Sequence, residues 1–165
     1  MKLGVSYNLY DGEELLEASI RSIRSHVDYI NVVYQDTSNA GERREIRLKD
    51  FLMPLVDNGL IDSLVLFEPY FGYKNNKIGT KNERKKRFIG MKDCARHGCS
   101  HFLLMDIDEF FRGEELDFAK SFIERWKPTV TAVPIVEYVK SPRCRLVSNY
   151  MFAPAGCDAD DYQFF

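Results

Sequence analysis

Apolar and polar residues alternate along this chain with two different periods. Short runs rich in β-branched and aromatic residues are typical of strands, and between them apolar residues recur every three or four positions, as in amphipathic helices. The predicted strands span 3–10, 28–35, 61–67, 101–105 and 129–139. The predicted helices span 13–26, 42–58, 80–97 and 116–126. Pro134, inside the last predicted strand, indicates an edge position or a bulge.

The order of these elements predicts the fold class. Strands that alternate with helices favour a mainly parallel sheet with helices on both faces, which is an α/β fold. The chain has 165 residues, of which 45% are hydrophobic, enough for one domain with its own core over 1–165. Because it stops on Tyr162-Gln163-Phe164-Phe165, without a helix cap or a polar tail, we also expect the fold to be incomplete at its C-terminal end.

Charge and hydropathy exclude several classes of protein. The net charge is −2, which disfavours a globally basic nucleic-acid-binding protein. No apolar run approaches the roughly 18 to 20 residues of a membrane-spanning helix, and the N-terminal residues lack the apolar segment of a signal peptide. We therefore expect a cytoplasmic protein with no membrane span and no nucleic acid as its partner.

The cysteines indicate reduced thiols. There are 4 of them, too few and too scattered for a disulfide framework. Four of the residue types that bind zinc do lie close together, at Cys94, His97, Cys99 and His101. Structural zinc sites usually take ligand pairs from separate segments, because so short a loop closes a tetrahedron with difficulty. This spacing therefore argues against zinc.

The strongest candidate for chemistry is the acidic run Asp106-Ile107-Asp108-Glu109-Phe110, which directly follows a predicted buried strand. Residues i and i+2 of a strand share a face, so Asp106 and Asp108 are expected to point the same way. Two close carboxylates repel each other unless a cation lies beside them, and Mg²⁺ or Mn²⁺ prefers such oxygen ligands. The alternative is a solvated acidic turn. A calcium loop is excluded because aromatic residues stand at its fifth and sixth positions.

With this acidic run after its fourth predicted strand, the chain resembles the GT-A fold glycosyltransferases, in particular family 2 and the related bacterial family-2-like group with a DxDEF motif. The resemblance covers 3–139. It rests on the strand–helix order, on Tyr7-Asn8, on the helix that starts near Glu14, on the turn from Tyr34 to Ser38, and on the DxDEF run. The family often has Glu directly after Asn, whereas here Glu13 follows only after Leu9-Tyr10-Asp11-Gly12.

The resemblance implies a nucleotide-diphosphate sugar as donor and a divalent metal ion, Mn²⁺ or Mg²⁺, as cofactor. Asp106 and Asp108 would be the metal motif, with Asp106 also part of the donor site. Asp36 would accept hydrogen bonds from the base or ribose. Ser6, Tyr7 and Asn8 would line the nucleotide pocket.

A strongly basic stretch accompanies the predicted helix over 80–97. A solvated helix face is one interpretation, since Lys and Arg commonly extend over apolar neighbours. A nucleic-acid patch is a second, although the net negative charge weakens it. In the glycosyltransferase interpretation the start of this helix faces the diphosphate, with Lys81 and Arg84 as its candidate ligands.

The resemblance also implies a catalytic base that is not evident here. Inverting family members carry a carboxylate after the DxD motif that deprotonates the acceptor hydroxyl of a glycan or other acceptor. The candidates are Glu137 and the group Asp158, Asp160 and Asp161, none within the family's pattern. We therefore expect the donor half of a transferase without its acceptor half, with a flank covered by a second copy or by further chain. A nucleotide-binding module without turnover is the alternative.

Overall fold

The computed structural model describes residues 1–71, 78–128 and 130–131. The chain divides into two units, Met1–Lys120 and Ser121–Phe165, and each is considered by itself. The sheet and the candidate site lie in the first unit. The expectation of one domain over 1–165 stays a prediction.

The first unit contains a sheet of strands that all run parallel. Its strands are β1 (Leu3–Leu9), β2 (Tyr29–Tyr34), β3 (Ser63–Leu66) and β4 (His101–Asp106). Their order across the sheet is β3-β2-β1-β4. The predicted α/β class with a parallel sheet is confirmed. Of the fifth predicted strand, 129 and 132–139 lie outside the described residues.

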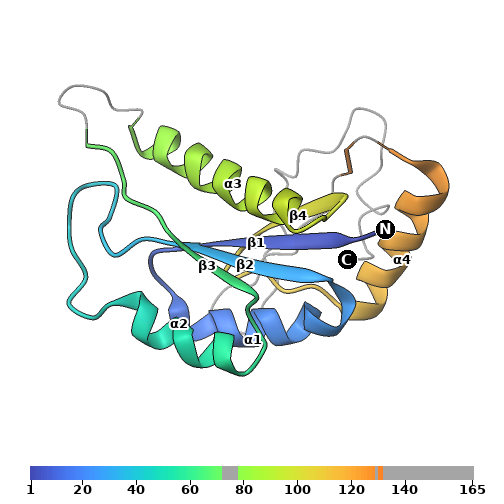
Figure 1. Ribbon diagram of the computed structural model, residues 1–165, viewed down its shortest axis with the longest axis horizontal. Helices are drawn as coiled ribbons and strands as arrows, with labels where there is room; N and C mark the ends of the chain where they lie inside the picture. Colours follow the sequence, from blue (N-terminus) through green and yellow to red (C-terminus); the bar gives the residue numbers. More distant parts are fainter. Residues whose placement is uncertain (72–77, 129, 132–165) are drawn as a thin grey trace, which may run out of the picture. The chain divides into compact units, whose positions relative to one another are not determined.

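Helices cover both faces of this sheet, as predicted. They are α1 (Glu13–Ile23), which continues into the short helix η1 (Arg24–His26), α2 (Leu48–Asp57) and α3 (Ile78–Arg96). A further helix, α4 (Gly113–Trp126), follows β4 along the chain. Figure 1 shows α1 and α2 along one face and α3 across the opposite face. α4 crosses the boundary between the two units. Among the described residues, no helix combines the length and hydropathy needed to cross a membrane.

The largest difference from a predicted boundary is at the start of α2. The helix expected over 42–58 begins only at Leu48, because Asp36 fixes its start: the Asp36 Oδ1 accepts a hydrogen bond from the Leu48 backbone N–H at 3.0 Å. The segment before α2 pairs instead with the residues that follow β2. Thr37 and Arg43 form an antiparallel β-bridge, and the Arg44 backbone N–H donates a 2.9 Å hydrogen bond to the Asp36 carbonyl. The polar run 42–47 therefore forms a loop.

The face beneath α1 and α2 holds the hydrophobic core. Every second residue of β1 and β2 points into this core. There these side chains pack against apolar residues that recur at helical spacing in α1 and α2. The core members from the strands are Leu3, Val5, Tyr7, Leu9, Ile30, Val32, Tyr34 and Met105. Those from the two helices are Leu16, Ile20, Ile23, Leu48, Leu52 and Leu55. This alternation explains why the strands and helices on this face of the sheet could be predicted from the sequence, apart from the start of α2.

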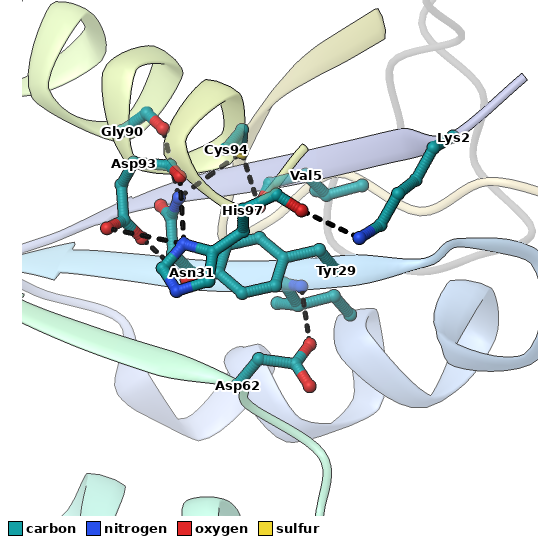
Figure 2. Close-up of polar contacts among 10 residues, drawn as sticks. Lys2, Val5, Tyr29, Asn31, Asp62, Gly90, Asp93, Cys94 and His97 are labelled. Carbon is teal, nitrogen blue, oxygen red and sulfur yellow. Dashed lines mark hydrogen bonds and ion pairs between the residues drawn. The ribbon is translucent and has the colours of Figure 1, made fainter. Parts of the chain in front are cut away.

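The face beneath α3 is built differently. The buried stripe of α3 recurs every four residues and consists of Asn82, Lys86, Gly90 and Cys94. Gly90 allows close approach to the sheet, since a Cβ there would clash with the Ser6 Oγ. Figure 2 shows polar contacts that hold α3 against the sheet: Asn31 Nδ2 donates to Gly90 O at 3.0 Å and to Cys94 Sγ at 3.3 Å. Hydrogen bonds replace apolar contact here.

The C-terminal end of α3 is held by the same kind of contact (Figure 2). The Lys2 Nζ donates to the His97 carbonyl at 2.7 Å, and the His97 ring stacks on Tyr29 with centroids 4.3 Å apart. The Tyr29 hydroxyl donates to Asp93 Oδ2 at 2.8 Å. Cys94 and Cys99 are free thiols, and burial raises the pKa of Cys94 to about 12. His97 and Cys94 thus have packing roles.

Candidate functional site

The topology marks one edge of the sheet as the natural binding position. From β1 the chain passes through α1 to β2 on one side, whereas β4, on the other side of β1, is reached through α3 on the opposite face. In open α/β sheets, ligands bind outside the carboxyl ends of the strands where the strand order reverses in this way. Asn8 of β1 and Asp106 of β4 are register partners at that edge.

Polar side chains from β1, β4 and α3 meet there. The Arg87 Nη2 contacts both carboxylate oxygens of Asp106, at 3.2 and 3.3 Å, and its Nε donates to Glu83 Oε1 at 3.0 Å. The Asn8 Nδ2 donates to the same Glu83 oxygen at 3.3 Å. With Lys86, these residues form what we term the Asp106 cluster: Asn8, Glu83, Lys86, Arg87 and Asp106.

Lys86 is the unusual member of the cluster. Its residue is only 4% exposed, yet its ammonium forms no hydrogen bond or ion pair within the described part of the chain. Burial lowers the pKa of Lys86, and the nearby Glu83 and Asp106 carboxylates oppose that shift only in part. The Lys86 side chain is almost completely covered, while its Nζ keeps some access to solvent, so this position is unlike an ordinary surface lysine.

The Asn8 side chain also has a polar atom without a hydrogen-bond partner among the described residues. Its Oδ1 is buried and accepts no hydrogen bond from any residue that the structure describes. Buried polar atoms are almost always paired, so a buried acceptor beside Asp106 is a second feature that a ligand could complete. The Asp106 cluster therefore combines an unmet donor with an unmet acceptor.

The acidic run forms a turn rather than an extension of the strand. β4 ends at Asp106, whose N–H donates to Glu109 Oε2 at 2.9 Å while Glu109 N donates back to Asp106 O at 3.1 Å. Asp108 is exposed. The expectation that Asp106 and Asp108 share a strand face is thus corrected. Burial raises the pKa of Glu109, and the Asp106 and Asp108 charges add to that rise.

The residues of this edge fit a hard divalent ion in their chemistry. Asp106, Asp108 and the unpaired Asn8 Oδ1 are all oxygen donors. Mg²⁺ is usually held by one or two carboxylates together with substrate phosphates, so a complete cage of protein ligands is not required. In the described residues no group of three or more His, Cys, Asp or Glu side chains is arranged around a metal position. The cation now at Asp106 is the Arg87 guanidinium.

The structure separates the three residues expected to line the nucleotide pocket. Asn8 lies in the Asp106 cluster, whereas Ser6 and Tyr7 are both 0% exposed. Ser6 is covered by Gly90, and the Tyr7 hydroxyl forms a 2.9 Å hydrogen bond with Ser19 Oγ on the α1 side. The structure does not bring Ser6 or Tyr7 to the site.

The other predicted donor ligands lie around the same edge or outside the described residues. Asp36 is half-buried at the end of β2, with Oδ1 bound to the start of α2. Lys81 and Arg84 are exposed on α3. Glu13 forms an ion pair with Arg44. The candidates for the catalytic base, Glu137, Asp158, Asp160 and Asp161, lie outside the described residues.

An open groove adjoins the cluster along α3 and β4. Its volume is about 480 Å³, and it is lined by Arg84, Lys85, Arg87, Phe88, Met91, Phe102 and Leu104. The lining surface is mostly apolar, from Phe88 and Met91 of α3 as well as from the β4 residues, and the three basic side chains of α3 border it. The groove thus adds an apolar surface next to the Asp106 cluster.

Sequence reasoning missed three members of the cluster: Glu83, Lys86 and Arg87. It selected Lys81 and Arg84 because they begin the basic helix, but the sheet-facing side of α3 is set by Gly90 and Cys94. Counting back four residues from Gly90 reaches Lys86. The small residues at this spacing were the available signal.

No family model, no curated protein and no solved structure matches this chain in the three comparisons made. The class that the residues and their geometry define is an α/β protein with a polar cluster at the carboxyl edge of a parallel sheet.

Proposed function

We propose that this chain binds a nucleotide-diphosphate sugar at the carboxyl edge of β1 and β4 and is the donor-binding part of a glycosyltransferase. The observation that carries the proposal is the Asp106 cluster at the point where the strand order reverses. It joins two carboxylates, an unpaired amide oxygen and two cations in one place. The resemblance of the DxDEF run to that family supports the same conclusion.

Asp106 and Asp108 would hold a Mn²⁺ or Mg²⁺ ion, with the Asn8 Oδ1 as a further oxygen donor. Such an ion supplies Lewis-acid stabilisation of the charge that develops on a leaving diphosphate. Arg87 offsets the charge of Asp106; burial opposes its charged form, but Asp106 and Glu83 outweigh burial and raise the pKa of Arg87. The guanidinium therefore stays charged and holds Asp106 in position.

Asp36 would bind the base or ribose of the donor. Its Oδ1 is engaged by the Leu48 N–H, and its Oδ2 has no hydrogen bond from the residues described here. That second oxygen is the one offered to a ligand hydroxyl. Lys81 and Arg84, exposed on the first turns of α3, would add positive charge near the diphosphate.

Transfer to an acceptor hydroxyl further requires a general base. In this proposal that base is Glu137, Asp160 or Asp161, and the acceptor is a glycan or another hydroxyl compound. A nucleotide-binding module without turnover is the alternative, and a transfer assay with mixed glycan acceptors separates the two. A homo-oligomer that covers the groove flank belongs to the proposal, and sedimentation tests it.

The proposal is tested by calorimetric titration of the chain with a panel of nucleoside diphosphates, with and without Mn²⁺. We expect one base to be preferred and its affinity to rise with Mn²⁺. Binding of none of the panel, or equal affinity with and without metal, would contradict the proposal. An oligonucleotide serves as comparison, because the exposed cations of α3 would give binding that falls steeply with salt if nucleic acid were the true ligand.

A further inference from the structure

Lys86 is a cation in a position where helices that cover sheets normally carry apolar or small residues. The sheet-facing stripe of α3 places Asn82 one turn before it and Gly90 one turn after it, and all three are buried. Asn82 has a structural explanation, since it exchanges hydrogen bonds with the Tyr70 backbone N–H and C=O at 3.1 Å each. Lys86 has no such explanation.

The carboxylates near Lys86 are already engaged. Arg87 contacts both oxygens of Asp106 and one oxygen of Glu83, and Asn8 donates to that same Glu83 oxygen. Lys86 feels the charges of Glu83, Asp106 and Arg87 but is hydrogen-bonded to none of them. The three N–H donors of its ammonium are thus left for a group that the described residues do not supply.

A structural ion pair would not need this arrangement. Replacing a whole buried ion pair by apolar side chains of similar volume is often neutral or stabilising, so stability alone does not explain a covered lysine that forms no hydrogen bond with the described residues. An ammonium acts as a compact point charge, which suits the oxygens of phosphate groups. The best acceptor for the hydrogen bonds of the Lys86 ammonium is therefore an anion with several oxygens, bound at the edge where Asn8 and Asp106 meet.

We propose that Lys86 is a diphosphate ligand, whose ammonium donates hydrogen bonds to phosphoryl oxygens of a nucleoside diphosphate bound at the Asp106 cluster. This inference rests on the proposed function and assigns the contact to a buried residue instead of to the exposed Lys81 and Arg84. Lys86 acts from inside the cluster, whereas those two side chains add only screened surface charge.

The test compares Lys86→Met with Lys92→Met, using magnesium pyrophosphate as the probe. Both variants lose one positive charge from α3, but Lys92 is exposed and outside the groove lining, whereas Lys86 is buried. We expect Lys86→Met to weaken pyrophosphate binding by about tenfold to a hundredfold, the range for a hydrogen bond between charged groups. Lys92→Met should change it by less than about twofold, since exposed charges are screened.

Thermal unfolding of the same variants separates binding from folding. If Lys86 is a ligand, Lys86→Met unfolds at about the same temperature as the wild type, because Met keeps the apolar length of the side chain and no hydrogen bond to the described residues is lost. A lower unfolding temperature together with unchanged pyrophosphate affinity would make Lys86 a structural residue and overturn the inference. Lys86→Arg keeps the positive charge and serves as a second test if Lys86→Met does not fold. We expect Lys86→Arg to retain part of the pyrophosphate affinity.

The nucleoside distinguishes this inference from the proposed function. Wild-type protein that binds pyrophosphate through Lys86 but binds no nucleotide sugar would refute the proposed function and leave the anion site standing. If the wild type and Lys86→Met bind a nucleoside diphosphate equally well, the inference about Lys86 is refuted and the proposed function stands. Absence of pyrophosphate binding by the wild type, measured calorimetrically with and without Mg²⁺, would overturn the inference outright.

Discussion

The two faces of the sheet carry different residues, although the same strands build both. Along β1, the residues that face α1 and α2 are Leu3, Val5, Tyr7 and Leu9, whereas those that face α3 are Gly4, Ser6 and Asn8. β2 repeats the contrast, with Ile30 and Val32 in the core and Asn31 hydrogen-bonded to α3. We call these the core face and the α3 face.

The contrast separates stability from chemistry. The core face buries apolar side chains, and burial of apolar area is the main favourable contribution to folding. The α3 face holds buried polar atoms without partners among the described residues, including the Ser6 Oγ, the Asn8 Oδ1 and the Asn31 Oδ1. Proteins break their own packing rules mostly where they bind or react. The candidate site lies at the carboxyl end of the α3 face.

The largest expected effect is a loss of stability on the core face. Leu16 of α1 is 0% exposed, so Leu16→Ala should lower the free energy of unfolding by about 2–5 kcal/mol through lost burial and a cavity. Its neighbour Leu15 is 39% exposed, and Leu15→Ala should cost less than about 1 kcal/mol. Urea denaturation measures both. Equal losses would mean that the core face is not where stability is concentrated.

The next effect is a loss of binding without a loss of stability. Asp108 is exposed in the turn after β4, so Asp108→Asn should leave the free energy of unfolding within about 0.5 kcal/mol. In the proposed site it should remove the strengthening of nucleotide-diphosphate binding by Mn²⁺, expected at about tenfold or more. Asp57→Asn, an exposed carboxylate at the end of α2, is the control. Calorimetry with and without Mn²⁺ gives the answer, and an unchanged metal effect would leave Asp108 a solvated turn residue.

The same contrast explains what the sequence predicts well. The apolar runs of β1 and β2 and the helical spacing in α1 record burial directly, so the parallel α/β fold could be derived from them. The start of α2 could not, because Asp36 and Leu48 meet only in the folded chain. A hydrogen bond between residues that far apart leaves no periodic signal.

The candidate site was predicted only where it follows an apolar strand. Asp106 was found because it ends β4, but its partner Arg87 depends on how α3 is rotated over the sheet. Hydrophobic periodicity treats lysine as solvent-facing, so it gives no reason to single out Lys86 within the basic stretch of α3. Because the sheet-facing residues of α3 around Gly90 are polar or small, the periodicity of apolar residues does not reveal which side of α3 is buried.

A smaller effect is expected at Asp36, where folding and binding share one carboxylate. Asp36→Ala should weaken nucleotide binding by about 1–3 kcal/mol because it leaves a ligand hydroxyl unpaired. It should also destabilise the fold by about 0.5–2 kcal/mol, since Leu48 N–H loses its acceptor at the start of α2. Asp36→Asn keeps that acceptor and should affect binding more than folding. Nucleotide affinity that is the same in all three proteins would make Asp36 a turn residue only.

The smallest effects contrast neighbours on opposite faces. The Ser6 hydroxyl is fully buried under Gly90 with no hydrogen-bond partner among the described residues, so Ser6→Ala should leave stability unchanged or raise it by up to about 1 kcal/mol. Tyr7→Phe removes the bond to Ser19 and should cost about 0.5–1.5 kcal/mol. Neither should alter nucleotide affinity, because neither side chain reaches the surface. Denaturation and calorimetry of the pair check this, and a Ser6→Ala variant that lost nucleotide affinity would place Ser6 in the pocket after all and would extend the binding site along the α3 face.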